Sequence, residues 1–115
     1  MKQGEIWLIN LDPTVGAEIK KIRPAIIVND NALGKLPLKI IVPITDWKER
    51  YGTAPWMTKL EPDSENGLTK VSVADNFQIR SVSQERIVKR IGTVSETIMD
   101  DIRIGLAKVL SIDSE

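Results

Sequence analysis

The chain has 115 residues, of which 42% are hydrophobic and 28% are charged, and its 16 basic and 16 acidic residues cancel to a net charge of zero. This length and composition predict one soluble globular domain spanning residues 1–115. The N-terminus lacks the apolar segment of a signal peptide and no stretch is long enough to span a bilayer, so we expect a cytoplasmic protein with no membrane association. Balanced charge excludes a generally basic surface, so any RNA binding must use a local patch.

The chain contains neither histidine nor cysteine. Disulfides, thiolate nucleophiles and cysteine-ligated zinc are therefore excluded, and the commonest general acid–base side chain is missing. This argues against a serine hydrolase triad, a zinc hydrolase and a histidine-dependent ribonuclease. We expect no metal and no cofactor, and any catalysis has to use Asp, Glu, Arg, Lys, Thr, Ser or Tyr.

Apolar runs separated by turn residues predict a mostly antiparallel β protein. The runs lie at residues 5–11, 24–29, 38–45, 56–60, 69–74 and 87–91. Proline has no N–H, so Pro24 and Pro43 are expected at strand entrances, edges or bulges.

The period of the apolar residues changes after Ser95. A spacing of three and four residues places an apolar face on one helix, made by Ile98, Ile102, Leu106, Val109 and Leu110. Ser95 is a suitable N-cap. The predicted fold class is therefore mostly β (α+β), with a small curled sheet of antiparallel strands and a single C-terminal helix packed on it.

Two polar side chains stand at the ends of apolar strands. Arg23 lies where a loop becomes a strand, and Thr45 lies where a strand becomes a loop. The planar guanidinium fork of arginine suits a phosphoryl-transfer site, because it holds two phosphate oxygens and stabilises charge that grows on them. A salt bridge from Arg23 to Glu18 or Asp75 is the structural alternative, and threonine is also an ordinary strand residue.

Two further segments carry cationic and aromatic residues. In the loop at residues 12–22, Lys20 and Lys21 form with Arg23 a cationic cluster suited to phosphates, although a mobile surface connection has the same composition. In the second segment, Trp47, Tyr51 and Trp56 surround a charged loop that contains Lys48 and Arg50. Its aromatic rings suit base stacking and a protein interface equally well.

Five short motifs follow one another in a characteristic order along nearly the whole chain. They are Gly4-Glu5-Ile6-Trp7, Leu11-Asp12-Pro13-Thr14, Arg23-Pro24-Ala25-Ile26-Ile27-Val28, Val42-Pro43-Ile44-Thr45 and Gln78-Ile79-Arg80-Ser81-Val82. In this order and spacing the chain resembles the MazF/PemK family of toxin endoribonucleases. The resemblance implies an SH3-like small barrel of the MazF/PemK/CcdB type.

The resemblance also implies an activity and partners. The expected protein is a homodimeric toxin of a toxin–antitoxin system that cleaves single-stranded RNA, namely mRNA, at specific sequences without a metal. Attack by the ribose 2′-OH would leave 2′,3′-cyclic phosphate and 5′-OH ends. The expected partner is a cognate MazE-like antitoxin whose acidic tail lies over the RNA groove.

The expected site combines the matching motifs with the chemistry of the cationic and aromatic segments. The resemblance implies catalytic roles for Arg23 and Thr45, and the proton acceptor is expected to be Glu18 or Asp75. Some family members have a histidine where this chain has Ala17, so that role does not carry over. The residues expected to contact RNA are Lys20, Lys21, Trp47, Lys48, Arg50, Tyr51, Trp56, Gln78 and Arg80.

Two rival functions remain open on the sequence. Gyrase-poisoning toxins of the CcdB type share the fold but end in Trp-Gly-Ile, whereas this chain ends in Ile112-Asp113-Ser114-Glu115. The second rival is a non-catalytic SH3-like binding module, in which Arg23 and Thr45 would be incidental.

Overall fold

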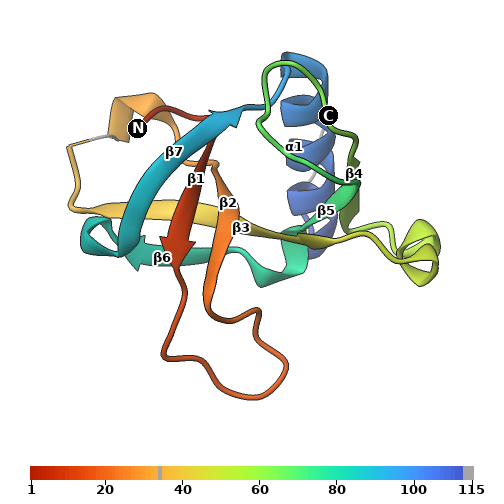
Figure 1. Cartoon of the computed structure of the whole chain (residues 1–115), viewed down its shortest axis with the longest axis horizontal. Coiled ribbons are helices and arrows are strands. Elements are labelled where there is room, and N and C mark those ends of the chain that lie inside the picture. The colour runs from red at the N-terminus through yellow and green to blue at the C-terminus, as the bar shows by residue number, and fades with distance from the viewer. Residues whose placement is uncertain (34, 113–115) are drawn as a thin grey trace.

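A computed structural model describes residues 1–33 and 35–112 (Figure 1). The last three residues of the chain, which were compared with the ending of the gyrase-poisoning toxins, lie outside this part. The strands are β1 (Glu5–Asn10), β2 (Ile22–Ile27), β3 (Leu38–Asp46), β4 (Met57–Leu60), β5 (Ser72–Asp75), β6 (Arg80–Ser83) and β7 (Ile87–Thr93). Short 3-10 turns are η1 (Asn31–Leu33), η2 (Glu49–Thr53), η3 (Asn76–Gln78) and η4 (Gln84–Arg86), and the helix α1 is Glu96–Leu110.

The strands form a 7-stranded antiparallel sheet in the order β4-β5-β3-β2-β1-β7, with β6 paired to β3. The predicted class, mostly β with one C-terminal helix, is confirmed, and each predicted apolar run overlaps a strand. The sequence pattern missed β6, because its four residues are mostly polar and only Val82 is buried. No helix in the described part of the chain is long and apolar enough to cross a membrane.

Strand β3 is nine residues long and changes partners along its length. Its first part pairs with β6, from Leu38 to Ile41, and its middle pairs with β2, from Ile41 to Pro43. Its last part, from Ile44 to Asp46, pairs with β5. One strand therefore joins the β1–β2–β7 side of the sheet to the β4–β5 side, as its long horizontal course in Figure 1 shows.

The two prolines lie where β2 and β3 separate. Pro43 is the last residue of β3 that pairs with β2, and Pro24 comes just before the first β2 residue paired with β3. Pro24 nevertheless lies inside the ladder with β1, opposite Leu8. The expectation of an edge position is therefore met for the β2–β3 ladder but not for the β1–β2 ladder. Without N–H groups, the prolines cannot extend the β2–β3 ladder in the usual way.

The alternating side chains of β2 and β3 build a core on each face of the sheet. One core includes Ile26, Val42 and Ile44 and is covered by Met99 and Ile102 of α1. The other is made by Ile9, Leu11, Ala25, Ile27, Ile41 and Val82. Register shifts between β1 and β7 are β-bulges, which bend β7, and β7 curves strongly in Figure 1.

The helix begins at the predicted cap, because the Ser95 side chain accepts a hydrogen bond from the Ile98 N–H. On the predicted apolar face Ile98, Ile102 and Leu106 pack in the core, whereas Leu110 is 53% exposed. At Gly105 the helix comes so close to Asn76 of η3 that an added Cβ would lie 2.3 Å from the Asn76 amide nitrogen. That amide is fully buried and donates to Thr58 Oγ1 at 3.0 Å. The contact fixes η3 against the helix.

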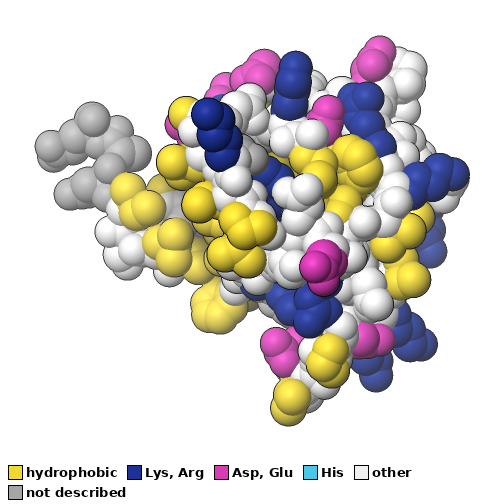
Figure 2. Space-filling model, turned by 90° about the vertical axis from the view of Figure 1, so that its left-hand side faces the viewer, with side chains coloured by type: hydrophobic (Ala, Val, Ile, Leu, Met, Phe, Trp, Pro, Cys, Tyr) yellow, Lys and Arg dark blue, Asp and Glu magenta, His cyan; other side chains and the backbone are white. Residues whose placement is uncertain are grey.

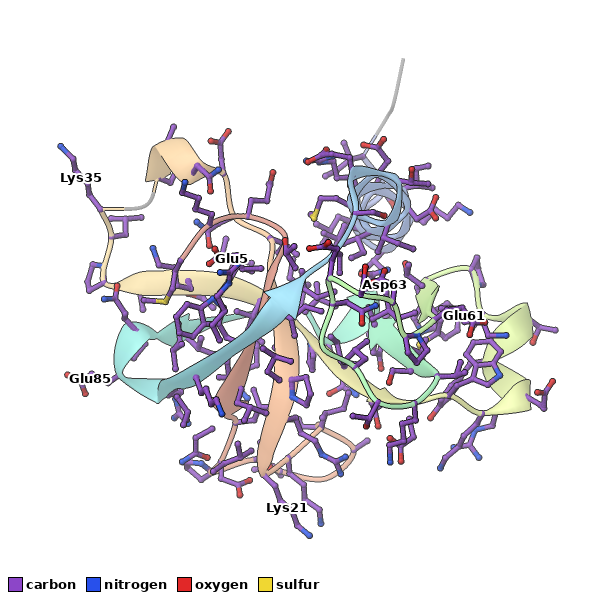
Figure 3. All side chains as sticks on the ribbon, turned by 45° about the horizontal axis from the view of Figure 1, so that its top comes forward. Glu5, Lys21, Lys35, Glu61, Asp63 and Glu85 are labelled. Carbon is purple, nitrogen blue, oxygen red and sulfur yellow. The ribbon has the colours of Figure 1, made fainter. Side chains whose placement is uncertain are left out.

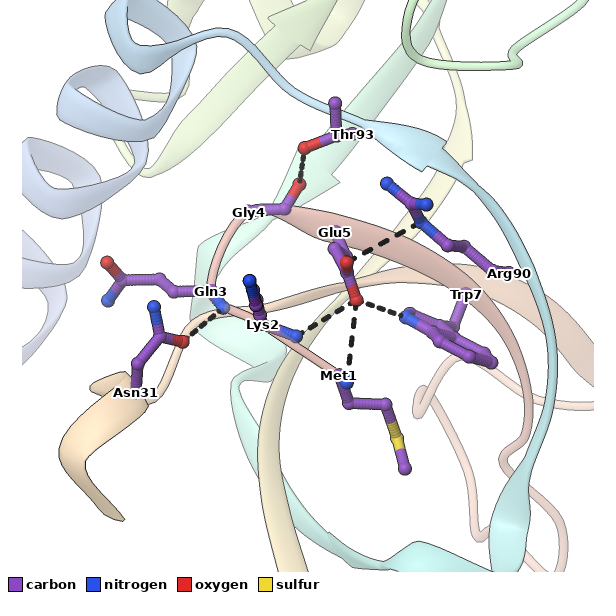
Figure 4. A network of polar contacts seen from close by, with 9 residues as sticks. All are labelled: Met1, Lys2, Gln3, Gly4, Glu5, Trp7, Asn31, Arg90 and Thr93. Atoms are coloured by element: carbon purple, nitrogen blue, oxygen red, sulfur yellow. Dashed lines mark hydrogen bonds and ion pairs between the residues drawn. The ribbon is translucent and has the colours of Figure 1, made fainter. Parts of the chain in front are cut away.

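The carboxylate of Glu5 binds several groups of the N-terminal segment and one of β7 (Figure 4). It accepts hydrogen bonds from the Lys2 N–H at 2.9 Å and the Trp7 indole at 3.1 Å, and it forms ion pairs with the Met1 amine at 3.7 Å and Arg90 at 3.6 Å. Burial by itself would raise the pKa of Glu5, but these hydrogen bonds and charges outweigh it and hold the pKa below its ordinary value of 4.5.

We expect Glu5→Gln to lower the free energy of unfolding by about 1 kcal/mol at neutral pH, because the replacement keeps an acceptor and loses the charge. The folded pKa lies below the unfolded one, so the ionised carboxylate stabilises the fold above pH 4.5, and this contribution disappears as the pH falls through the folded pKa. The difference between variant and wild type should therefore shrink below pH 4.5 in urea titrations.

Glu85→Gln is the control for this prediction, because Glu85 is exposed on η4 and projects from the surface in Figure 3. It should leave the free energy of unfolding nearly unchanged. An equal loss in both variants, or a Glu5→Gln effect that is independent of pH, would contradict the role given to the Glu5 carboxylate.

Candidate active site

Arg23 and Thr45 lie two residues beyond the last β2–β3 pair, which is Ala25 opposite Pro43. In an antiparallel ladder the pairs advance by one residue on each strand in opposite directions, so this register places Arg23 across from Thr45. Both residues line a cleft of about 310 Å³, which we call the arginine cleft. The two residues predicted from separate strand ends are thus brought together.

In the part of the chain that the structure describes, no carboxylate forms an ion pair with Arg23. Its Nε donates to the Lys20 carbonyl at 3.3 Å, and the side chain is half-buried. Within the described residues, the salt bridge to Glu18 or Asp75 that the sequence left open is not formed. The cleft therefore contains a cationic fork suited to an anion.

The arginine cleft also contains a residue that sequence reasoning missed. Lys70 lines it and pairs with Asp46 at 3.0 Å. The segment before Lys70 reaches the cleft through Gly67, whose φ of 68° favours glycine and whose added Cβ would lie 2.5 Å from the Ile91 carbonyl oxygen. In the sequence, Lys70 stands out only as a lysine just before a buried strand. The folded structure is needed to show that its loop approaches β3 and brings it to the arginine cleft.

A second cleft of about 470 Å³ has Pro43 in its lining, the β3 residue that precedes Ile44 of the arginine cleft. We call it the glutamate cleft. It contains three predicted site residues, Glu18, Gln78 and Arg80. The predicted catalytic residues are therefore not all brought together. Arg23 and Thr45 line the arginine cleft, Glu18 lines the glutamate cleft, and Asp75 lines neither.

The two carboxylates predicted as proton acceptors differ in their surroundings. Glu18 is exposed and accepts a hydrogen bond from the Val15 N–H at 2.6 Å. Asp75 is only 7% exposed, and its oxygens accept from the Phe77 N–H at 3.1 Å and the Gln78 amide at 3.3 Å. Burial raises the pKa of Asp75, although these hydrogen bonds oppose the rise.

Gln78 and Arg80, both expected to contact RNA, form hydrogen bonds within the protein. Gln78 accepts from the Ile19 N–H at 2.6 Å and donates to the Ala17 carbonyl at 3.3 Å. Arg80 donates to the Leu11 carbonyl at 3.2 Å. Both side chains therefore support the β1–β2 loop. The exposed lysines predicted in this loop include Lys21, which projects from the lower end of the molecule in Figure 3.

The aromatic residues expected to contact RNA form separate groups. Trp47 and Tyr51 meet edge to face with ring centres 6.2 Å apart, and Arg50 lies 5.3 Å from the Tyr51 ring centre. Lys59, which sequence reasoning missed, lies 4.6 Å from the Trp47 ring centre.

Trp56 instead meets Phe77 edge to face at 6.2 Å, beside the C-terminal part of α1. Lys48, Arg50 and Trp56 are exposed. The rings of this segment are thus available on two different parts of the surface.

Comparison with known proteins identifies close relatives. The family model for the PemK-like, MazF-like toxin of type II toxin–antitoxin systems matches residues 2–110. Endoribonuclease PemK from Escherichia coli is 34% identical over 113 residues, covering 96% of this chain and 83% of the relative. Endoribonuclease MazF9 from Mycobacterium tuberculosis is also 34% identical, over 102 residues that cover 83% of each chain.

Solved structures share the fold. MazF from Deinococcus radiodurans superposes with a TM-score of 0.80 at 21% identity, covering 97% of both chains. A mycobacterial endoribonuclease in complex with its cognate antitoxin gives a TM-score of 0.78 at 20% identity, covering 100% of this chain and 99% of the other. On the match of residues 2–110 and the identity to these relatives, the chain belongs to the PemK-like, MazF-like family of type II toxins.

Proposed function

We propose that this protein is the toxin of a toxin–antitoxin pair and acts as a sequence-specific, metal-independent endoribonuclease on single-stranded RNA. The observation that carries the proposal is the meeting of Arg23 and Thr45 in one cleft, with no carboxylate neutralising the guanidinium within the described residues. The relatives named endoribonuclease support the same activity.

In the proposed reaction the substrate supplies its own nucleophile. The ribose 2′-oxygen loses its proton and forms a bond to the adjacent phosphorus, the bond from phosphorus to the 5′-oxygen breaks, and the leaving 5′-oxygen takes up a proton from solvent water. The products are a 2′,3′-cyclic phosphate and a 5′-OH. The guanidinium of Arg23 holds the phosphate oxygens as charge grows on them, and the Thr45 hydroxyl donates a further hydrogen bond. Among the described residues, no group of three or more carboxylates is placed to hold a metal ion.

The 2′ proton needs an acceptor, and the proposal assigns it to Glu18 or Asp75. Glu18 has the better access, because it is exposed at the glutamate cleft. Asp75 is the more enclosed carboxylate, and burial raises its pKa above the ordinary value of 3.8, which is the direction that suits a general base. The family's partner class, a MazE-like antitoxin, is part of the proposal, since related toxins are solved with antitoxins.

We expect Arg23→Ala to lower the rate of RNA cleavage on the order of 10²- to 10³-fold, because a preorganised charge donor is lost. Arg23→Lys should recover only part of this, since an ammonium keeps the charge but loses the fork. Thr45→Ala should cost less than Arg23→Ala, because a neutral hydroxyl stabilises charge less strongly than a guanidinium. Cleavage of a labelled RNA in EDTA measures all three variants.

Arg103→Ala is the matched control for these variants. Arg103 lies exposed on α1 and pairs with Asp100 at 2.7 Å, and it lines neither cleft. It should cleave at the wild-type rate. Near-normal cleavage by folded Arg23→Ala would move the active site elsewhere, and no cleavage by the wild-type protein would favour the binding module or the gyrase-directed toxin.

The nucleophile is tested on the substrate. Mapping the wild-type cut first locates the scissile phosphate, and the single ribose on its 5′ side is then replaced by deoxyribose. We expect cleavage to be abolished with RNA binding nearly unchanged, because the attacking hydroxyl is gone, and we expect EDTA to have no effect on the all-RNA substrate. Comparable cleavage of the deoxy oligonucleotide, or a strict divalent-ion requirement, would show that water is the nucleophile.

We further propose a homodimer. Large apolar side chains remain at the surface along the start of β3, with Leu36, Leu38 and Ile40 exposed by 55%, 48% and 39%. Figure 2 views the molecule from the side on which β3 begins, and hydrophobic side chains lie there among charged ones. Sedimentation equilibrium should give twice the chain mass at micromolar protein, and a concentration-independent monomer mass would overturn the proposal.

A further inference from the structure

We infer that Gln78 is a positioning residue whose amide latches the β1–β2 loop to η3 and thereby holds Glu18 and Arg23 in place. The loop, residues 11–21, lies far from Gln78 in sequence. It is secured at its base by Arg80, which donates to the Leu11 carbonyl, and by Arg86, which donates to the Asn10 and Asp12 carbonyls. The Gln78 latch is the contact made nearer the tip of the loop.

The Gln78 amide grips the loop at two points on either side of Glu18. Its oxygen accepts from the Ile19 N–H at 2.6 Å, and its nitrogen donates to the Ala17 carbonyl at 3.3 Å. A primary amide offers an acceptor and a donor in one plane, so this pair of contacts requires glutamine or asparagine chemistry. A side chain with only acceptors or only donors would satisfy one of the two points.

Asp75 decides which way the amide faces. Its Oδ2 accepts the second N–H of the Gln78 amide at 3.3 Å, while Oδ1 accepts from the Phe77 N–H. A flipped amide would place its oxygen against this carboxylate and its nitrogen against the Ile19 N–H. Asn76, which follows Asp75 in the chain, is buried against α1 and donates to Thr58. The turn that carries Gln78 is therefore held in place by the core.

The latch matters for the site because of what the loop carries. Glu18 lies between the two gripped residues, and the Lys20 carbonyl, a few residues on, accepts from Arg23 Nε. The expected effect of Gln78 on RNA cleavage rests on the proposed function. The contact itself is a property of the folded chain and can be tested without RNA.

The direct test is limited trypsin digestion of the whole protein. Trypsin prefers segments that are free to move, so opening of the loop should raise cleavage after Lys20 and Lys21, and the Arg23–Pro24 bond resists the enzyme. Lys35 is the internal reference, because it lies in another exposed loop at the opposite end of the molecule in Figure 3. We expect Gln78→Leu to raise cleavage after Lys20 and Lys21 on the order of tenfold, with cleavage after Lys35 unchanged.

Gln84→Leu makes the same change at an exposed glutamine on η4 and should leave both rates unchanged. An unaltered ratio of loop to Lys35 cleavage in Gln78→Leu would overturn the inference. If Gln78→Leu raises cleavage at every site, global unfolding is responsible, and a charge-swap pair then decides.

The charge-swap pair uses Gln78→Glu alone and combined with Asp75→Asn. Gln78→Glu keeps the acceptor for the Ile19 N–H but sets two carboxylates against each other, so loop cleavage should rise. Adding Asp75→Asn supplies an amide donor to the new carboxylate, and loop cleavage should fall back toward the wild-type rate. A double variant that is opened as far as Gln78→Glu, or farther, would overturn the assigned role of Asp75 in orienting the amide.

RNA cleavage gives a separate readout. In Gln78→Leu we expect kcat to fall on the order of tenfold with KM little changed, because the loop loses its catalytic position. Loop opening without any loss of cleavage would confine Gln78 to a structural role and overturn its positioning of the site. If the wild-type protein cleaves no RNA, the proposed function fails, while the digestion still decides the latch.

Discussion

The rest of the structure depends on the exchange of partners along β3. A strand has hydrogen-bonding edges that can serve different neighbours along its length, and β3 uses them to pair with β6, β2 and β5 in turn. Pro43 lies at the change from β2 to β5, and Pro24 lies opposite this point on β2. Because neither proline has an N–H to donate, the strands can separate here without leaving a buried donor unpaired.

This separation is also what creates the arginine cleft. Arg23 and Thr45 would be the next residues to face each other in the β2–β3 ladder, but they lie past its last pair, where the two backbones are no longer paired. Their positions are set by the paired residues immediately before and after them in the chain. A cationic side chain is therefore displayed at an open end of the sheet while its backbone remains part of a well-packed strand.

The carboxylates of this fold show how burial and partners compete. Glu5 is surrounded by donors and positive charges, and its pKa is lowered despite burial. The donors to Asp75 are neutral N–H groups of Phe77 and Gln78, and burial raises its pKa. The first carboxylate ties the N-terminus to β7 through Arg90. The second faces Gln78, on a turn that the close contact of Gly105 with Asn76 keeps against the helix.

Local pattern determined much of the architecture. Apolar runs and turn chemistry predicted most of the strands, and the spacing after Ser95 predicted the helix with its cap, because these signals act between residues close in sequence. β6 was missed since Arg80–Ser83 buries only Val82, and its pairing depends on β3, distant in the chain. The same limit applies to the site. Arg23 and Thr45 were recognisable from their strand ends and motifs, but Lys70 and the grip of Gln78 on Ala17 and Ile19 join segments that only the folded sheet brings together.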